Sequence, residues 1–400
     1  MRSVPSDSQK LLLFWVLLVA GLVIGSRVVV PQILLAWLAG LWLVLLLSGQ
    51  DERIETAAAG ALGIIGGLLV WQLTGGEAWL PTEPFAAILS TINGFRETLI
   101  DRIFTTLPEP HGSLLTGILI GNRTKLDPDL LAVFRTVGLT HLIAVSGYNL
   151  SILTSNVRSL LWPLLGRRSV GIAFGLIIVF VILSGAPPSI LRAAVMAASL
   201  LVAQYLGRPS RSINILVLAA GVLALFEPKI IFEIGFQLSL AATYGLIRLA
   251  PVIVSGLERF AGLPESLRLI IGETLAATIV TAPLLVLYFE RLSLISPISN
   301  LLVLPIMPLL MGLGIIGCLL LFLVPAIGQY LIQLTWPLLE WVVWVSQKLA
   351  AIPHATSNVS ATPWMAMTVF ALMILASEWL FAWWRQRAND PEIITLSIRS

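Results

Sequence analysis

The chain has 400 residues, of which 58% are hydrophobic and only 11% are charged. This composition excludes an ordinary soluble domain, which covers its surface with far more charge, and it is typical of a protein embedded in a bilayer. The net charge of +3 is too small to indicate nucleic-acid binding by itself, and the single cysteine excludes an internal disulfide and a cysteine metal site.

The apolar runs are about 20 residues long and do not alternate with polar residues, which predicts membrane helices and not a barrel. We expect an all-α, polytopic helical membrane protein with about 12 transmembrane helices, within a range of 10–12. The first apolar run has no cleavage signal behind it and is expected to be a retained span. Residues 1–76 form an N-terminal membrane segment with three spans, near residues 11–25, 28–48 and 56–73.

Residues 77–138 have a different pattern and are predicted to form an extracytoplasmic amphipathic helical layer. Between residues 84 and 107 apolar side chains recur at helical spacing, with charged side chains on the opposite face. A short apolar helix is expected at 113–121. Asp127 and Pro128 are typical of an N-cap and a first-turn proline, and they predict a helix through Arg135.

Residues 139–384 form a second membrane block, followed by a tail at 385–400. The stretch at 291–308 is apolar but contains two prolines, which favours a re-entrant or discontinuous helix. Arginine and lysine concentrate in the links that lie inside if the N-terminus is cytoplasmic, so both termini are predicted to be cytoplasmic. The spans are expected near residues 139–165, 169–184, 188–206, 212–226, 231–250, 269–289, 303–324, 327–350 and 362–384.

The stretch 138–153 begins as a glycine-bearing polar turn and continues as an apolar helix. It places His141, Ser146, Gly147 and Asn149 at a membrane boundary. Ser146 resembles the serine of an intramembrane protease, but a base five residues away is poorly placed on one helical face. We therefore interpret these residues as candidates for a channel entrance or for close helix packing.

Further polar residues within predicted spans are candidates for an internal polar path. Arg192 either reaches the outer interface or lines a cavity. Gln237 either lines the path or makes an interhelical hydrogen bond. The complete set of path candidates is His141, Ser146, Gly147, Asn149, Arg192, Gln237, Ser239, Glu273 and Asn300.

No catalytic set, metal-ligand spacing or phosphate-binding loop is evident in the sequence. We therefore expect no cofactor, no metal and no enzymatic activity. An intramembrane hydrolase and a secondary transporter of a small or lipid-linked solute remain as alternatives to a channel.

Five motifs in order resemble the core of the ComEC competence family. They lie at 114–126, 134–147, 184–196, 235–239 and 296–305, and include Gly138-Leu-Thr-His-Leu142 and Ser296-Pro-Ile-Ser-Asn300. The resemblance implies a channel in the bacterial inner membrane that passes single-stranded DNA into the cytoplasm during natural transformation. It also implies a cytosolic helicase-type ATPase and an outer DNA receptor as partners; the oligomeric state is left open.

The chain departs from the family pattern in three ways. Tyr148 and Asn149 replace the Leu-His that commonly follows Ser-Gly in the family. We expect neither the OB-fold domain nor the metallo-β-lactamase-like domain that many members carry, so strand degradation would require a separate nuclease. Cations near the expected outer mouth suit a phosphate backbone. These DNA-mouth candidates are Arg123, Lys125 and Arg135.

Overall fold

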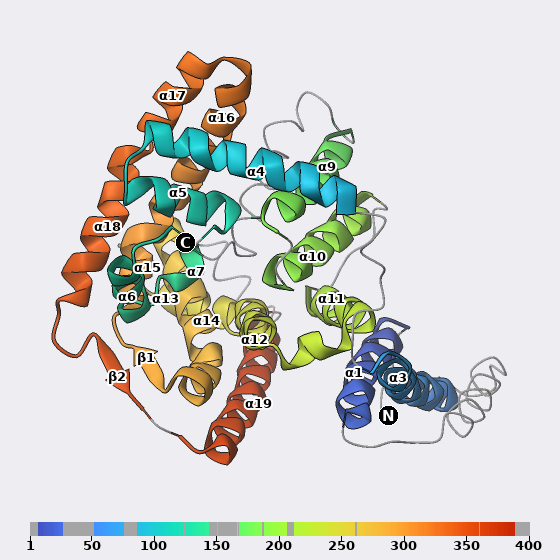
Figure 1. Cartoon of the computed structure of the whole chain (residues 1–400). Helices are drawn as coiled ribbons and strands as arrows, with labels where there is room; N and C mark the ends of the chain where they lie inside the picture. Colours follow the sequence, from blue (N-terminus) through green and yellow to red (C-terminus); the bar gives the residue numbers. More distant parts are fainter. Residues whose placement is uncertain are drawn as a thin grey trace. The chain divides into compact units, whose positions relative to one another are not determined.

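The computed structural model describes residues 7–26, 52–75, 86–122, 125–143, 150, 166, 168–185, 188–205, 212–260, 262–359 and 361–388. It confirms an all-α protein, apart from two strands of three residues each (Figure 1). The chain forms two compact units. Unit 1 comprises residues 1–92, 154–182 and 186–237, and unit 2 comprises 93–153, 183–185 and 238–400.

Small residues hold unit 1 together where α1 and α3 cross. A Cβ on Gly21 would overlap the carbonyl of Ile64, and a Cβ on Gly67 would overlap that of Leu18. These glycines therefore let the two backbones approach closely, as is common between membrane helices. The helices of unit 1 are α1 (Asp7–Gly25), α3 (Glu52–Thr74), α9 (Arg168–Leu183), α10 (Pro188–Tyr205), α11 (Ser212–Phe226) and the 3₁₀ helix η2 (Pro228–Phe232).

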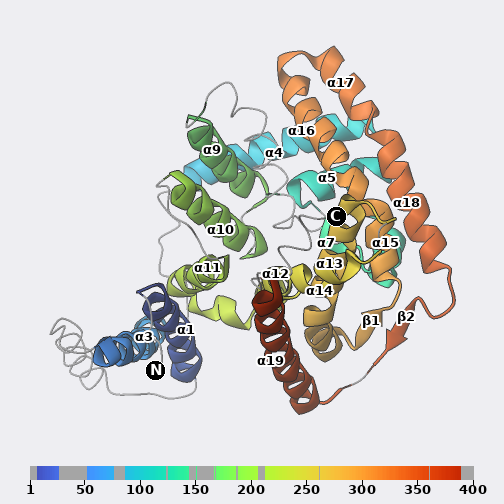
Figure 2. The same cartoon turned by 180° about the vertical axis from the view of Figure 1, so that it is seen from behind.

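The core of unit 2 surrounds α5 (His111–Ile120), all of whose residues are buried. Helix α5 contacts α7, α16 and α18, and it lies beside α16 in both views (Figures 1 and 2). The other elements are α4 (Ala86–Thr106), α6 (Pro128–Thr136), α7 (Thr140–Ile143), α12 (Ile234–Arg248), α13 (Ala250–Leu257), α14 (Glu265–Phe289), β1 (Arg291–Ser293), α15 (Ser296–Val303), η3 (Leu304–Ile306), α16 (Met307–Leu323), α17 (Pro325–Gln333), α18 (Trp336–Ala350), β2 (Thr356–Asn358) and α19 (Pro363–Ala388). The first residues of α4 and α12 belong to unit 1.

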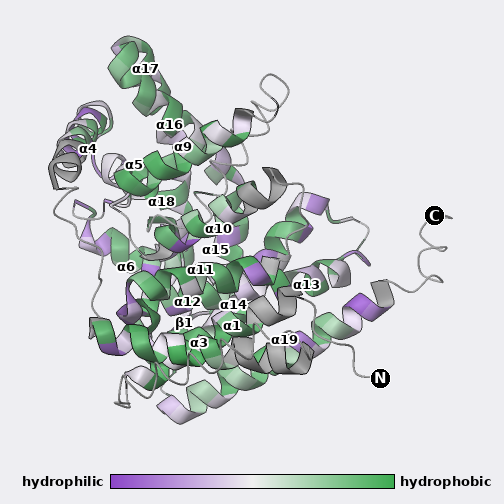
Figure 3. Ribbon diagram, turned by 90° about the vertical axis from the view of Figure 1, so that its right-hand side faces the viewer, coloured by the Kyte–Doolittle hydropathy of each residue, from purple (hydrophilic) through white to green (hydrophobic). Residues whose placement is uncertain are grey.

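Two local predictions for residues 84–136 are confirmed. The amphipathic segment forms α4, which buries Leu99, Ile100 and Ile103. Asp127 caps α6, because its side chain accepts a hydrogen bond of 3.1 Å from the Asp129 amide. Apolar residues dominate α5 and α16, whereas α4 and α6 mix apolar and polar residues (Figure 3).

The described residues contain three helices that are long and apolar enough to cross a membrane. They are α14, the run Ser296–Leu323 and α19; the pair α12 and α13, bent by 43°, could make a fourth. The expected number of about 12 is therefore not confirmed. Shorter apolar helices make up part of the remainder, and the predicted span 28–48 and most of 139–165 lie outside the described residues.

The C-terminal half differs from the expected spans in two places. The expected span 327–350 is divided between α17 and α18, with Pro337 in the first turn of α18. The interrupted segment at 291–308 contains β1, which pairs antiparallel with β2, and then α15, which continues through η3 into α16. The helix thus continues as one run from Ser296 to Leu323, with a 3₁₀ turn at Leu304–Ile306 where Pro305 lies, and the expected break is reduced to this turn.

Candidate functional site: a polar junction around Gly138

The turn that follows α6 depends on Gly138. The Leu139 amide donates to the Phe134 carbonyl at 2.9 Å, which closes the end of the helix, and Gly138 has a φ of 75° in the left-handed region. A Cβ at this position would lie 2.6 Å from both Cβ and Oγ of Ser296. Glycine is therefore required both by the backbone conformation and by the contact with α15.

Serine hydroxyls from the region of α15 satisfy the carbonyls at this helix end. Ser293 Oγ donates to the Thr136 carbonyl at 2.7 Å, and Ser299 Oγ donates to the Val137 carbonyl at 2.6 Å. The last carbonyls of a helix have no partner within the helix, so these bonds join the two segments. We name this arrangement the polar junction; it comprises Thr136, Val137, Gly138, Ser293, Ser296, Ser299 and Asn300.

Asn300 contributes the side-chain amide of the polar junction, and only 6% of its surface is exposed. Its Nδ2 lies 3.5 Å from Ser296 Oγ, at the limit of a hydrogen bond. Its Oδ1 is buried and bonds to none of the described residues. The junction therefore retains one buried acceptor beside its serines, which is costly unless something donates to it.

The imidazole of His141 contacts the same turn from α7. Its Nδ1 lies 3.0 Å from the Gly138 carbonyl, to which a protonated Nδ1 donates, and the side chain is exposed. The structure thus brings His141 and Asn300, two of the path candidates, to one turn. Ser146, Gly147 and Asn149 lie outside the described residues, so their position relative to this turn stays a prediction.

Two further path candidates belong to unit 1. Arg192 in α10 is 3% exposed, and its Nε and Nη1 hydrogen-bond to none of the described residues. Gln237 Nε2 donates to the Ile231 carbonyl at 2.9 Å. This bond joins α12 to the preceding 3₁₀ helix η2, and both roles considered from the sequence stay predictions.

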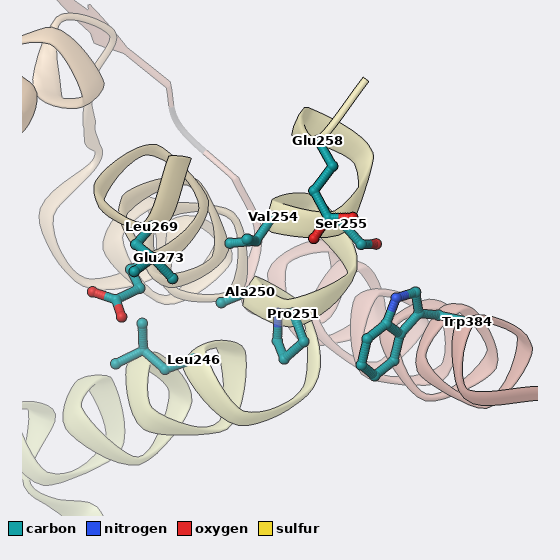
Figure 4. A pocket seen from close by; sticks show the side chains of 9 residues that line it. All are labelled: Leu246, Ala250, Pro251, Val254, Ser255, Glu258, Leu269, Glu273 and Trp384. Carbon is teal, nitrogen blue, oxygen red and sulfur yellow. The ribbon is translucent and has the colours of Figure 1, made fainter. Parts of the chain in front are cut away.

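Ser239 and Glu273 lie in unit 2, outside the polar junction. Thr243 donates from its hydroxyl to the Ser239 carbonyl at 2.9 Å. Glu273 is exposed and lines an open pocket of about 340 Å³ between α12, α13, α14 and α19. In Figure 4 Glu273 and Trp384 lie on opposite sides of this pocket, with Ala250 and Pro251 between them.

Lys125 and Arg135 are exposed, as expected for DNA-mouth candidates. Lys125 Nζ lies 4.0 Å from an Asp101 carboxylate oxygen and 4.4 Å from the centroid of the Phe104 ring. Surface pairs of this kind contribute little to stability and exchange readily with other anions. Arg123 lies outside the described residues.

Sequence reasoning missed a pair between α5 and α18, formed by a buried histidine and a half-exposed glutamate. His111 is 6% exposed, and its Nε2 lies 2.8 Å from a carboxylate oxygen of Glu340. The ring also contacts Trp336, with centroids 5.5 Å apart. No spacing rule could find this pair, because its members are 229 positions apart.

A second missed cluster joins α12 to α19. The Tyr244 hydroxyl donates to Glu378 at 2.8 Å and lies 2.9 Å from Ser377 Oγ. Arg248 Nε is 2.9 Å from the same Glu378 oxygen, and its guanidinium lies over the Phe381 ring at 4.6 Å. The position of a carboxylate and an arginine within apolar helices was the only available signal.

The chain matches the family model described as "Competence protein" over residues 118–387. It is 27% identical over 283 residues to ComE operon protein 3 of Bacillus subtilis (strain 168), an alignment that covers 70% of this chain and 36% of that protein. The chain thus spans about a third of the length of this curated relative. No solved structure matches. The family match covers more than half of the chain and includes both sides of the polar junction, so the chain belongs to the competence protein family.

Proposed function

We propose that this chain is the channel portion of a DNA-uptake system and passes single-stranded DNA through the bacterial inner membrane into the cytoplasm. The observation that supports this most directly is the polar junction. Two of the motifs that carry the family resemblance, at 134–147 and 296–305, meet there, because Ser299 Oγ donates to the Val137 carbonyl over a large separation in sequence. Their pairing is the expected result if both motifs serve one site.

The chemistry of the junction suits a path for a charged polymer. Each nucleotide of a strand brings one phosphate, so the wall must offer polar atoms without trapping the anion. Serine hydroxyls and the Asn300 amide are neutral donors and acceptors held at a buried position. The protons of Ser293 and Ser299 are already donated to the carbonyls of Thr136 and Val137, so these serines join the two segments without adding fixed charge. The exposed Lys125 and Arg135 provide cations at the surface.

The chain is then a multi-pass protein with both termini in the cytoplasm and with no catalytic role of its own. A cytosolic helicase-type ATPase would then supply the work, an outer receptor would deliver the DNA, and a separate nuclease would degrade the second strand. Each of these partners follows from the family resemblance and is part of the proposal.

Deletion of the gene in a transformable host tests the function. We expect labelled DNA to remain outside the cytoplasmic fraction, while binding of double-stranded DNA at the cell surface continues. The wild-type gene should restore uptake, and a Ser293→Ala/Ser299→Ala variant that reaches the membrane in normal amount should restore it poorly. Unchanged cytoplasmic uptake in the deletion strain would refute the proposal.

A secondary transporter is the competing function, and the 43° bend between α12 and α13 favours it, since broken helices often surround solute sites. This alternative predicts normal DNA uptake in the deletion strain together with a change in the accumulation of a small or lipid-linked solute. The same strain therefore separates the two functions.

A further inference from the structure

Helix α18 has two dissimilar faces. The inner face packs against α5, α6 and α15 and buries Leu339, Val342, Val343 and Val345. The outer face presents Trp341, which is 42% exposed, and Trp344, which is 49% exposed. Lys348 follows Trp344 by one turn and is also exposed. We name Trp341, Trp344 and Lys348 the aromatic stripe.

The two indole rings of the stripe form a rigid surface. Their centroids are 5.6 Å apart and their planes differ by 27°, so the rings are stacked. Trp341 Nε1 donates to the Leu302 carbonyl at 3.1 Å, which fixes the orientation of its ring. Leu302 lies in α15, the helix that also holds the polar junction. The stripe and the junction therefore share one supporting element.

Contact with lipid does not explain this surface well. Helix α18 has 15 residues, includes Glu340, Gln347 and Lys348, and is not among the helices that are apolar enough to cross a membrane. Its aliphatic residues Leu339, Val342 and Val343 are packed inward and are not presented to lipid. A pair of half-exposed tryptophans on such a helix indicates a surface that a partner covers.

The charge around the stripe favours an anionic partner. Lys348 supplies a cation at the end of the stripe. The Glu340 carboxylate, one position before Trp341, is half exposed and lies 2.8 Å from His111 Nε2. The nearest acidic residues of α6, Asp127 and Asp129, line a hollow of about 140 Å³ with Val343 and Gln347. Trp341, Trp344 and Lys348 are not among the residues that line that hollow, so the stripe itself combines aromatic rings with a positive charge.

We propose that the aromatic stripe is a stacking platform for single-stranded DNA, on which bases stack against Trp341 and Trp344 while the Lys348 ammonium pairs with a backbone phosphate. This combination is the one that proteins use to bind single strands without sequence preference. The inference rests on the proposed function and specifies where the strand contacts unit 2. Rings held in place lose little conformational freedom on binding, which suits a platform.

Binding of a fluorescent oligothymidylate to the full chain, measured by anisotropy in nanodiscs of zwitterionic lipid, tests the platform. Trp341→Ala/Trp344→Ala should weaken binding by about 10-fold or more, since stacking contributes substantially for each base. Trp341→Phe/Trp344→Phe keeps aromatic faces and should restore most of the affinity. Trp379→Ala, which removes an indole that is 66% exposed on α19, is the matched control and should leave binding unchanged.

An abasic strand of the same length separates stacking from charge. It should bind the wild-type chain and the double alanine variant equally, while Lys348→Ala should make the binding of both strands less dependent on salt. Equal oligothymidylate affinity for the wild-type and double alanine proteins would overturn the platform and leave the proposed function intact.

A wild-type chain that binds no single strand would overturn the platform as well, and DNA uptake in the deletion strain would then decide the proposed function separately. Strong quenching of Trp341 and Trp344 fluorescence by brominated lipids would assign the stripe to the membrane interface and would also overturn the platform.

Discussion

Replacement of Gly138 by alanine should destabilise unit 2 at the polar junction. A residue with a Cβ at a φ of 75° costs about 1–2 kcal/mol. The new Cβ would also meet Ser296 Cβ and Oγ at 2.6 Å, and overpacking of this kind costs about 1–3 kcal/mol. We therefore expect the free energy of unfolding to fall by about 2–5 kcal/mol, a large share of the stability of most proteins. Chemical denaturation of the chain in nanodiscs measures this loss.

A second substitution separates the two contributions. Ser296→Gly removes the atoms that the new Cβ would meet, so in the Gly138→Ala background it should recover the packing part and leave the backbone part. Gly256→Ala is the control, because a Cβ there meets nothing within 4 Å and the residue lies in α13. If Gly138→Ala unfolds at the same denaturant concentration as the wild-type chain, the turn is not constrained as the structure indicates.

Three further substitutions test other contacts within unit 2. Ser299→Ala leaves a buried carbonyl without its donor and should lower the free energy of unfolding by about 1–3 kcal/mol, measured by the same denaturation. Tyr244→Phe removes the hydroxyl that donates to Glu378 and should cost about 1 kcal/mol and speed the proteolysis of α19. Glu340→Ala leaves His111 Nε2 without its partner and should cost about 1 kcal/mol, because the carboxylate is half exposed, whereas Glu340→Gln should cost less.

For each of these three predictions there is a result that would contradict it. Thr368→Ala removes a hydroxyl that bonds only to a carbonyl of its own exposed helix turn, so it is the control for Ser299→Ala. Equal losses for the two would show that the bond across the junction adds nothing. Unchanged proteolysis of α19 in Tyr244→Phe would count against the role of Glu378 as an anchor. Equal stability of the Glu340→Ala and Glu340→Gln variants would count against the pair with His111.

Local signals in the sequence were sufficient for α4 and α6. Amphipathic spacing and an Asp-Pro cap act over a few residues, so they can be read without tertiary information. The break between α17 and α18 was missed because the run 327–350 is apolar enough on average to be taken as one span. Pro337, which occupies the first turn of α18, was the signal that could have revealed it.

The polar junction could be predicted only in part. The resemblance selected both motifs, but the bonds from Ser293 and Ser299 reach carbonyls more than 150 positions away, and no periodicity encodes such pairings. Gly138 was noted as part of a turn, yet the contact with Ser296, which also requires a glycine there, is present only in the folded chain. Arg192 was recognised as unusual in sequence, and its burial became evident only from the packing of unit 1.

The complete burial of α5 has a consequence for the order in which the protein assembles. The chain is synthesised from its N-terminus, so α5 emerges long before α16 and α18, the helices that cover it. Until they are made, its apolar residues must be shielded by lipid, by insertion factors or by provisional neighbours. We therefore expect unit 2 to mature late, after synthesis of α18, and truncations before Trp336 to be recognised and degraded as unfinished protein.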